Sequence, residues 1–191
     1  LKAAAPHIAH RAIRNLGTWG GSLAYGDPAA EWPACSLTLQ ATMVIHGPAG
    51  ERKISAKDFF IDLYTTSLEP DEILVATEIP VAKPNQVFYF HELARRHGDY
   101  AVAGLAAVAE KQGDILSNCV FTFFSVSSTP VMAVRAQDLV NGKPVNDQLI
   151  AAAVEAARQE IDAIADITNS AEAKTHLIGV LLERGLKHLA A

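Results

Sequence analysis

Two adjacent glycines, Gly20 and Gly21, are flanked by the hydroxyl side chains of Thr18 and Ser22. Glycines let backbone N–H groups approach an anionic ligand with no side chain in the way. The flanking hydroxyls can donate hydrogen bonds to phosphate oxygens. The segment therefore has the chemistry of a phosphate-binding loop. The same residues also suit an ordinary turn, and the glycines alone do not separate the two interpretations.

The sequence gives less support for a metal site, a Ser–His–acid triad or a reactive cysteine. The seven histidines are scattered, and only His7 and His10 lie within one helical turn of each other, so we expect no bound metal. No Gly-x-Ser-x-Gly segment occurs, so no Ser–His–acid triad is expected. Cys35 and Cys119 form no Cys-x-x-Cys pair and are expected to be buried, reduced thiols. We therefore assign no catalytic side chain.

The glycines belong to a longer pattern, RNLGTWGGSLAYGDPAAEWPA, at residues 14–34. This segment resembles the second flavin-binding loop of the FAD subunit of molybdenum hydroxylases, the family of xanthine dehydrogenase and the carbon monoxide dehydrogenase medium subunit. The family's pattern is I-R-N-x-G-T-I-G-G-N/S-L, followed by D-P-A-A-D-x-P. The resemblance implies FAD-binding roles, mainly at the phosphate and sugar portion, for Thr18, Trp19, Gly20, Gly21, Ser22, Asp27 and Glu31.

Two positions depart from that pattern. Trp19 stands where the family usually has isoleucine, which adds bulk beside the glycines. Glu31 stands where aspartate is usual. Its carboxylate can still accept a hydrogen bond from a ribitol or ribose hydroxyl, but it reaches one methylene further.

Two later segments also resemble the family. Residues 72–80, EILVATEIP, are similar to its D-E-I-L-x-x-I-x-I-P strand, which implies that Leu74 packs against the flavin ring. Residues 90–101, FHELARRHGDYA, are similar to its K/E-x-A-R-R-x-G-D-x-A stretch, which adds Glu92 to the cofactor-binding residues. In the family the residue after Gly-Asp lies over the isoalloxazine face in a mobile loop. Tyr100 holds that position, where an aromatic ring can stack and exclude solvent.

The resemblance implies an oxidoreductase subunit that holds FAD and passes electrons from iron–sulfur clusters through FAD to an acceptor. Molybdopterin and the clusters would belong to partner chains, a molybdopterin-binding large subunit and an iron–sulfur subunit. The family's first flavin loop, of the A-G-G-T/H-D/S-L type, does not occur in these residues. We therefore expect the amino-terminal part of the flavin domain to be missing, and the isolated chain to be inactive. Two alternatives stay open, an assembly fragment that binds no flavin by itself and a free-standing protein that binds another small molecule.

The elements that must position these residues follow one another in blocks. Asp27 is expected to cap a short helix that runs to about Leu39, with Pro28 in its first turn. Strands are expected at residues 41–46, 52–54, 73–80, 87–94, 101–111 and 115–127, the last two joined as an antiparallel hairpin by residues 112–114. Three helices are expected at residues 131–140, 147–164 and 169–189, the second with an apolar face ending at Ile164 and the third beginning at Asn169.

Strands followed by helices indicate an α+β fold. The resemblance implies the later part of a PCMH-type FAD-binding domain at residues 1–82. A carboxy-terminal domain of antiparallel strands and three helices would follow at residues 83–191. The boundary coincides with the proline-flanked segment at residues 80–84.

Composition limits the partners. The formal net charge of the 191 residues is −5, so no basic excess attracts nucleic acid or anionic lipid, and neither is expected as a partner. No apolar run approaches the roughly 18–20 residues that cross a bilayer. The amino terminus has no charged-then-apolar signal pattern, so a cytoplasmic location is expected.

Overall fold

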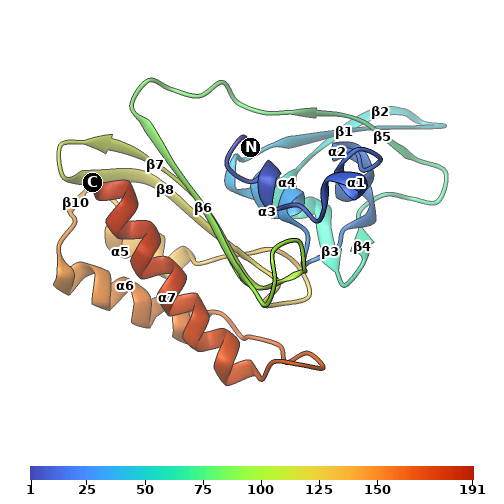
Figure 1. Ribbon diagram of the computed structural model, residues 1–191. Helices are drawn as coiled ribbons and strands as arrows, with labels where there is room; N and C mark the ends of the chain where they lie inside the picture. Colours follow the sequence, from blue (N-terminus) through green and yellow to red (C-terminus); the bar gives the residue numbers. More distant parts are fainter.

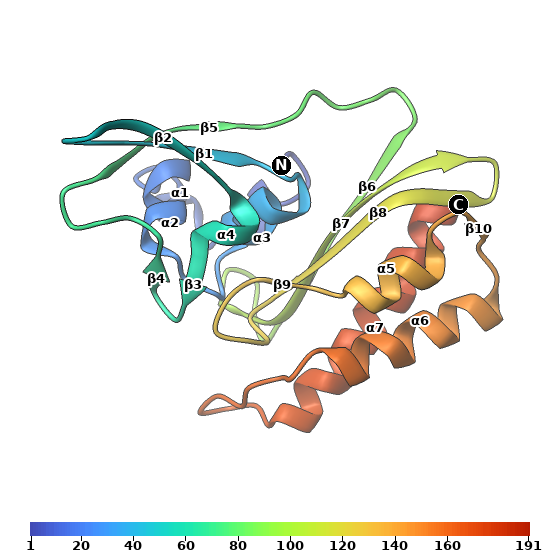
Figure 2. The same ribbon diagram turned by 180° about the vertical axis from the view of Figure 1, so that it is seen from behind.

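The structure is a computed structural model that describes residues 1–191. A long antiparallel sheet occupies the middle of the molecule (Figure 1). The last part of the chain, orange to red, covers one face of that sheet with helices. The first part, blue to cyan, lies beside the other face (Figure 2). The separation of strands and helices confirms the α+β class, with antiparallel sheets throughout.

The amino-terminal part is built on a three-stranded antiparallel sheet in the order β2-β1-β5. Its apolar cluster includes Leu23, Met43, Ile45 and Phe59, all fully buried. The elements of this part are η1 Ala5–His7, α1 Arg11–Arg14, α2 Trp19–Tyr25, α3 Glu31–Thr38, β1 Thr42–Gly47, β2 Gly50–Ser55, α4 Ala56–Phe59, β3 Phe60–Asp62, β4 Thr65–Thr66 and β5 Ile73–Glu78.

The carboxy-terminal part contains the long sheet, in the order β10-β8-β7-β6, with β9 paired to β8. The predicted hairpin is confirmed, because β7 and β8 pair antiparallel across residues 113 and 114. The strands are β6 Gln86–Ala94, β7 Ala101–Gln112, β8 Ile115–Phe124, β9 Val131–Met132 and β10 Lys143–Pro144, and the helices are α5 Val134–Val140, α6 Asp147–Glu160 and α7 Ala171–Ala190.

Both faces of β7 are buried, which explains why its sequence is almost continuously apolar. One face packs on the helices in a single large cluster that contains Leu105, Phe121 and the α7 stripe Ile178, Leu182, Leu186 and Leu189. The other face meets α3, where Ala34 and Cys35 pack against residues of β7 and β8. The long sheet therefore forms the layer that joins the two parts of the chain.

Three expected helix boundaries were wrong. Residues 131 and 132 form strand β9, so α5 begins only at Val134. Helix α6 ends at Glu160, and the backbone N–H of Ile164 donates to the carbonyl of Val126 instead of continuing the helix. Helix α7 is capped by Ser170, whose hydroxyl accepts from Ala173 N, because the Asn169 side chain binds Asp166.

Two expectations near the amino terminus also need correction. Asp27 caps no helix, since α3 begins at Glu31 with Ala30 as its N-cap. The Gly20–Gly21 pair lies within helix α2 and does not form a turn.

The strand expected at residues 115–127 ends at Phe124, because Ser125 adopts a left-handed φ of 61° that a strand does not allow. None of the helices is both long enough and apolar enough to cross a membrane.

Candidate functional site

The start of helix α2 presents the first group of predicted residues. Thr18 is the N-cap, and its Oγ1 accepts a hydrogen bond from Gly21 N at 3.0 Å. A Cβ at residue 21 would lie 2.8 Å from that oxygen, so a side chain at this position would require the Thr18 hydroxyl to shift. A Cβ at Gly20 would meet no atom within 4 Å. The backbone at Gly20 is therefore open to a ligand, whereas Thr18 and Gly21 satisfy each other.

The chain then turns sharply between α2 and α3. Gly26 ends α2 with a left-handed φ of 67°, a conformation that favours glycine. Asp27 follows, is only 8% exposed, and accepts a hydrogen bond from Ala29 N at 2.9 Å through Oδ1. This aspartate turn stands in place of the expected helix cap. It directs Asp27 and Glu31 to the same side of the molecule as Ser22, where all three line one cavity.

That cavity has a volume of about 290 Å³ and is completed by the loop between β6 and β7. The loop contributes Gly98, Asp99 and Tyr100. Gly98 has a φ of 85°, and a Cβ there would lie 2.5 Å from the imidazole of His10, so the loop and the amino-terminal segment approach as closely as glycine allows. Tyr100 is 73% exposed, so its side chain is free to cover a ligand.

Carboxylates dominate the electrostatics of this cavity. The charge of Asp27 is the largest effect on Tyr100 and raises the pKa of its phenol, with burial, Tyr25 and Glu31 adding to it. Burial raises the pKa of Glu31, and the charge of Asp27 raises it further against a backbone hydrogen bond. A hydroxyl that donates a hydrogen bond to Asp27 or Glu31 would relieve this crowding of negative charge.

Glu92 lies next to this group on β6. Burial, followed by the charge of Glu31, raises the pKa of Glu92 to about 7. Its Oε1 lies 3.6 Å from His7 Nδ1, and burial together with His91 and His97 lowers the pKa of His7. His7 is therefore neutral near neutral pH, and its contact with Glu92 is not an ion pair there. Glu92 Oε2 is buried without any hydrogen-bond partner, which leaves one acceptor unused.

The structure thus brings Ser22, Asp27, Glu31 and Tyr100 together, with Glu92 close to Glu31. Thr18, Gly20 and Gly21 do not line this cavity but begin the same short helix as Ser22. Two predicted residues instead have their side chains in the amino-terminal apolar cluster. These are Trp19, whose ring centroid lies 5.0 Å from that of Trp32 in a tilted arrangement and whose Nε1 donates to Thr77 Oγ1 at 3.1 Å, and Leu74 on β5.

The sequence patterns missed the wall formed by the amino-terminal segment, where Ile8, Ala9 and Ile13 line the cavity. Arg14 holds this segment in place, because its Nη1 donates to the carbonyls of Ile8 and Ala9 at 2.6 Å each. Arg14 belongs to the I-R-N motif, so this motif was the one part of the sequence that could have indicated the wall. The partners of Arg14 are backbone carbonyls, which no side-chain pattern reveals.

The residues present fit one part of FAD well. Two buried or half-buried carboxylates and a serine hydroxyl suit a chain of hydroxyl groups such as ribitol. The same carboxylates repel phosphate, so this cavity is not a pyrophosphate site. An exposed tyrosine beside the hydroxyl-binding groups suits a planar aromatic ring.

Comparisons with known proteins identify the family of the chain. Residues 1–82 match the family described as the FAD binding domain in molybdopterin dehydrogenase. Residues 88–189 match the CO dehydrogenase flavoprotein C-terminal domain. The nicotine 6-hydroxylase medium subunit of Paenarthrobacter nicotinovorans is 37% identical over 191 residues, which is 100% of this chain and 67% of that protein. The carbon monoxide dehydrogenase medium chain of Hydrogenophaga pseudoflava is 32% identical over 97% of this chain and 65% of its own length.

Solved structures give the same result. Carbon monoxide dehydrogenase from Hydrogenophaga pseudoflava superposes with a TM-score of 0.94 and 33% identity, over 98% of this chain and 65% of that chain. Quinoline 2-oxidoreductase from Pseudomonas putida 86 superposes with a TM-score of 0.90 and 38% identity, over 97% and 64%. The two family matches follow one another along the chain, at residues 1–82 and 88–189. The chain therefore belongs to the family of FAD-binding medium subunits of the molybdenum hydroxylases.

Proposed function

We propose that this chain forms one wall of an FAD site in an electron-transfer subunit, which receives electrons from iron–sulfur clusters and passes them through FAD to an acceptor. The observation that carries the proposal is the cavity that joins Ser22, Asp27 and Glu31 of one segment to Tyr100 of another. The two segments are about seventy residues apart, and each resembles the family's flavin-contacting sequence on its own. FAD, when bound, would supply the redox chemistry, and the side chains of this wall would bind and position it.

The side chains of this wall bind, orient and shield the cofactor. Asp27 and Glu31 accept hydrogen bonds from its hydroxyl groups, and Ser22 donates or accepts at the same side of the cavity. Glu92 on β6, whose pKa is raised by burial and by the charge of Glu31, would be a further cofactor-binding residue. Tyr100 covers the isoalloxazine ring and excludes water from it. The open backbone at Gly20, together with Thr18 and Gly21, approaches the phosphates, and Trp19 and Leu74 support the site from the apolar cluster.

The remaining parts of the site would come from outside these residues. The chain spans between 63% and 67% of the length of the medium subunits that it resembles. We infer that a further segment carries the first flavin loop, and that a molybdopterin-binding large subunit and an iron–sulfur subunit are partners. The chain alone would then be inactive. A division into residues 1–82 and 83–191 and a cytoplasmic location complete the proposal.

The experiment compares FAD binding by the complete subunit and by two matched glutamate variants. Glu31→Gln keeps the size of the side chain but weakens the acceptor in the cavity, so the dissociation constant for FAD should rise by about tenfold or more. Glu51→Gln makes the same chemical change at an exposed position of β2 and should leave FAD binding unchanged. Flavin fluorescence quenching on titration measures both constants.

The result also decides between the proposal and its alternative, an assembly fragment that binds no flavin. A complete subunit that retains no flavin under any condition would support the alternative. Equal FAD affinities for the Glu31→Gln and Glu51→Gln variants would show that Glu31 does not contact the cofactor, and the hydroxyl-binding role of the cavity would be rejected.

A further inference from the structure

Ser125 connects three segments that are far apart in the sequence. Its backbone N–H donates to the carbonyl of Pro28 at 2.8 Å, and its hydroxyl donates to the carbonyl of Ala101. Its own carbonyl accepts a hydrogen bond from Lys174 Nζ at 2.8 Å. All three polar groups of Ser125 are therefore used, and each binds a different segment. Pro28 follows Asp27, and Ala101 follows Tyr100, so two of these segments carry predicted flavin contacts.

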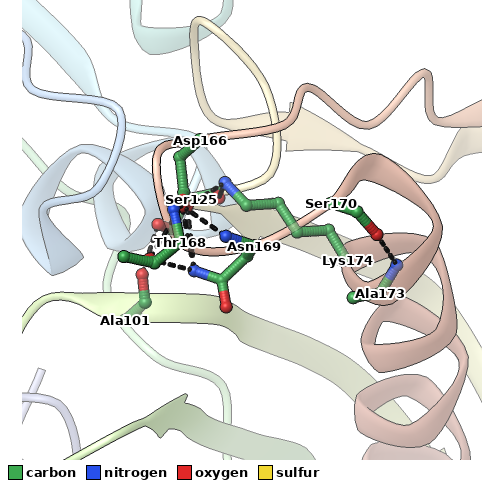
Figure 3. Close-up of polar contacts among 8 residues, drawn as sticks. All are labelled: Ala101, Ser125, Asp166, Thr168, Asn169, Ser170, Ala173 and Lys174. Atoms are coloured by element: carbon green, nitrogen blue, oxygen red, sulfur yellow. Dashed lines mark hydrogen bonds and ion pairs between the residues drawn. The ribbon is translucent and has the colours of Figure 1, made fainter.

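The third segment is held by a buried charge. Lys174 extends from the first turns of α7, and its side chain is only 6% exposed (Figure 3). Its ammonium group lies 3.0 Å from Asp166 Oδ2, in addition to the bond to the Ser125 carbonyl. Burial of a lysine is costly unless its charge is paired and hydrogen-bonded, and both conditions are met here. The geometry therefore ties the ammonium group to one place.

Asp166 is itself fixed by its own loop. The backbone N–H groups of Thr168 and Asn169 donate to its Oδ1, and the side chains of both residues add further hydrogen bonds (Figure 3). Burial raises the pKa of Asp166, but the hydrogen bonds from Thr168, Lys174 and Asn169 outweigh it and hold the pKa below its usual range. Asp166 is therefore ionised at neutral pH and keeps Lys174 paired.

The groups of this network also share a cavity with the flavin wall. Asp27, Tyr100, Ser125, Asp166 and Lys174 all line a depression of about 380 Å³. Asp27 and Tyr100 line the cavity of the proposed FAD site as well, so the two depressions meet at these two residues. A displacement of Ser125 would therefore move both predicted flavin contacts together.

We propose that Lys174 is a positioning residue for the flavin site: paired with Asp166, it holds Ser125, and Ser125 fixes the backbone beside Asp27 and Tyr100. The inference rests on the proposed function, because it concerns the placement of two residues of that FAD wall. It assigns to the carboxy-terminal helical layer a role in setting the environment of the flavin. Packing alone does not explain a buried lysine at residue 174, because an apolar side chain would fill the same space without burying a charge.

The test uses the complete subunit with two variants and one matched control. Lys174→Met removes the ammonium group and keeps the length of the side chain. Ser125→Ala removes only the bond to the Ala101 carbonyl, and alanine tolerates the positive φ as poorly as serine, so the backbone strain is unchanged. Lys187→Met makes the same change on the same helix at an exposed lysine, which pairs with Glu183. If Lys174→Met does not fold, Asp166→Asn, which removes the charge that pairs with Lys174, takes its place.

Two measurements are needed for each protein. The first is amide hydrogen exchange in peptides that cover residues 26–30 and 98–103. The second is the visible circular dichroism and the reduction potential of bound flavin. In the two test variants, exchange at residues 98–103 should be at least about fivefold faster than in Lys187→Met, the effect of losing one net hydrogen bond. The flavin dichroism and potential should shift with it.

Two results would overturn the inference. In one, exchange increases only within residues 161–175 and the loop that carries Tyr100 is unchanged. In the other, the loop exchanges faster while the flavin dichroism and potential stay at their wild-type values. A wild-type subunit that holds no flavin would reject the proposed function instead. The exchange comparison would then still decide whether Lys174 fixes the segments at Asp27 and Tyr100.

Discussion

At the scale of single residues, the site is defined by carboxyl groups that disturb one another. Burial is the largest effect that raises the pKa of Glu31 and of Glu92. The charge of Asp27 raises the pKa of Glu31 further, and the charge of Glu31 raises that of Glu92 further. Such a row of acids is costly in an empty site and becomes favourable when a ligand donates hydrogen bonds to it. We infer that these carboxyl groups lower the stability of the chain without ligand and favour the binding of a hydroxyl-rich ligand.

The raised pKa of Glu92 makes a direct prediction about pH. The folded chain keeps Glu92 protonated up to about pH 7, whereas the unfolded chain ionises it near 4.5. The folded state therefore binds more protons in this interval, and the free energy of unfolding should fall as pH rises through it. Glu92→Gln stays neutral, so at pH 8 the variant should be more stable than the wild type by about 1–3 kcal/mol.

Urea unfolding of the isolated chain at pH 4.5 and pH 8 measures this difference. The neighbours of Glu92, namely His7 and Glu31, stay in place in the variant, so the comparison reports the titration of Glu92 together with its coupling to these two groups. The Glu51→Gln variant serves as the exposed control. If wild type and Glu92→Gln lose the same stability between the two pH values, Glu92 is ionised in the folded chain and the assignment of its raised pKa is wrong.

Several residues that the sequence motifs predicted for the site line one cavity in the structure. Hydroxyl and carboxylate positions such as Ser22, Asp27 and Glu31 lie in fixed register behind the two glycines, so one local motif finds them together. Tyr100 lies in a second motif, and only the pairing of α3 with the long sheet brings it to the first. Ser125 has no motif at all. Its role depends on a left-handed backbone and three long-range bonds, which no local pattern encodes.

At the scale of elements, the sheet depends on one close contact between neighbouring strands. Gly104 on β7 lies opposite Phe124 on β8, and the Phe124 ring covers it. A Cβ at residue 104 would lie 2.0 Å from that ring. Gly104→Ala should therefore displace a fully buried phenylalanine and destabilise the chain by about 1–3 kcal/mol.

Chemical denaturation of the Gly104→Ala variant tests this prediction, with Gly20→Ala as the matched control. A Cβ at Gly20 meets no atom within 4 Å, and alanine has the higher helix propensity, so the control should keep or gain up to about 1 kcal/mol of stability. Equal stabilities for the two variants would mean that the Phe124 ring moves aside at no cost, and the contact would not be essential.

The sequence predicted the presence of helices and strands better than it predicted the residues at which they begin and end. Strands β1, β5, β6 and β7 were found within a few residues because alternating or continuous apolar runs end at glycine, proline or polar turns. Helix α6 stops at Glu160 although apolar residues continue at helical spacing to Ile164. Its end is set by the Ile164 backbone bond to Val126 on another element. A helix boundary that is fixed by a tertiary hydrogen bond cannot be recognised from the spacing of apolar residues in the sequence.

At the scale of the whole molecule, the long sheet separates two apolar cores of unequal size. The larger core lies between the sheet and α5, α6 and α7. The smaller lies within residues 19–79 around β1. Between them, Phe90 and Phe124 stack at 5.7 Å on the sheet face that meets α3. This arrangement favours a carboxy-terminal unit with its own core and an amino-terminal unit that depends on docking against it.

A fragment of residues 83–191 tests this division. It contains the long sheet, its three helices and the larger core, so it should fold alone with native-like far-ultraviolet circular dichroism and a cooperative thermal transition. Because α3 would no longer cover Phe90 and Ala106, it should bind a hydrophobic dye more strongly than the complete chain and melt at a lower temperature. Addition of residues 1–82 in trans should reverse both effects. A fragment without a cooperative transition would show instead that the amino-terminal layer is needed to complete the sheet, and that the chain folds as a single cooperative unit.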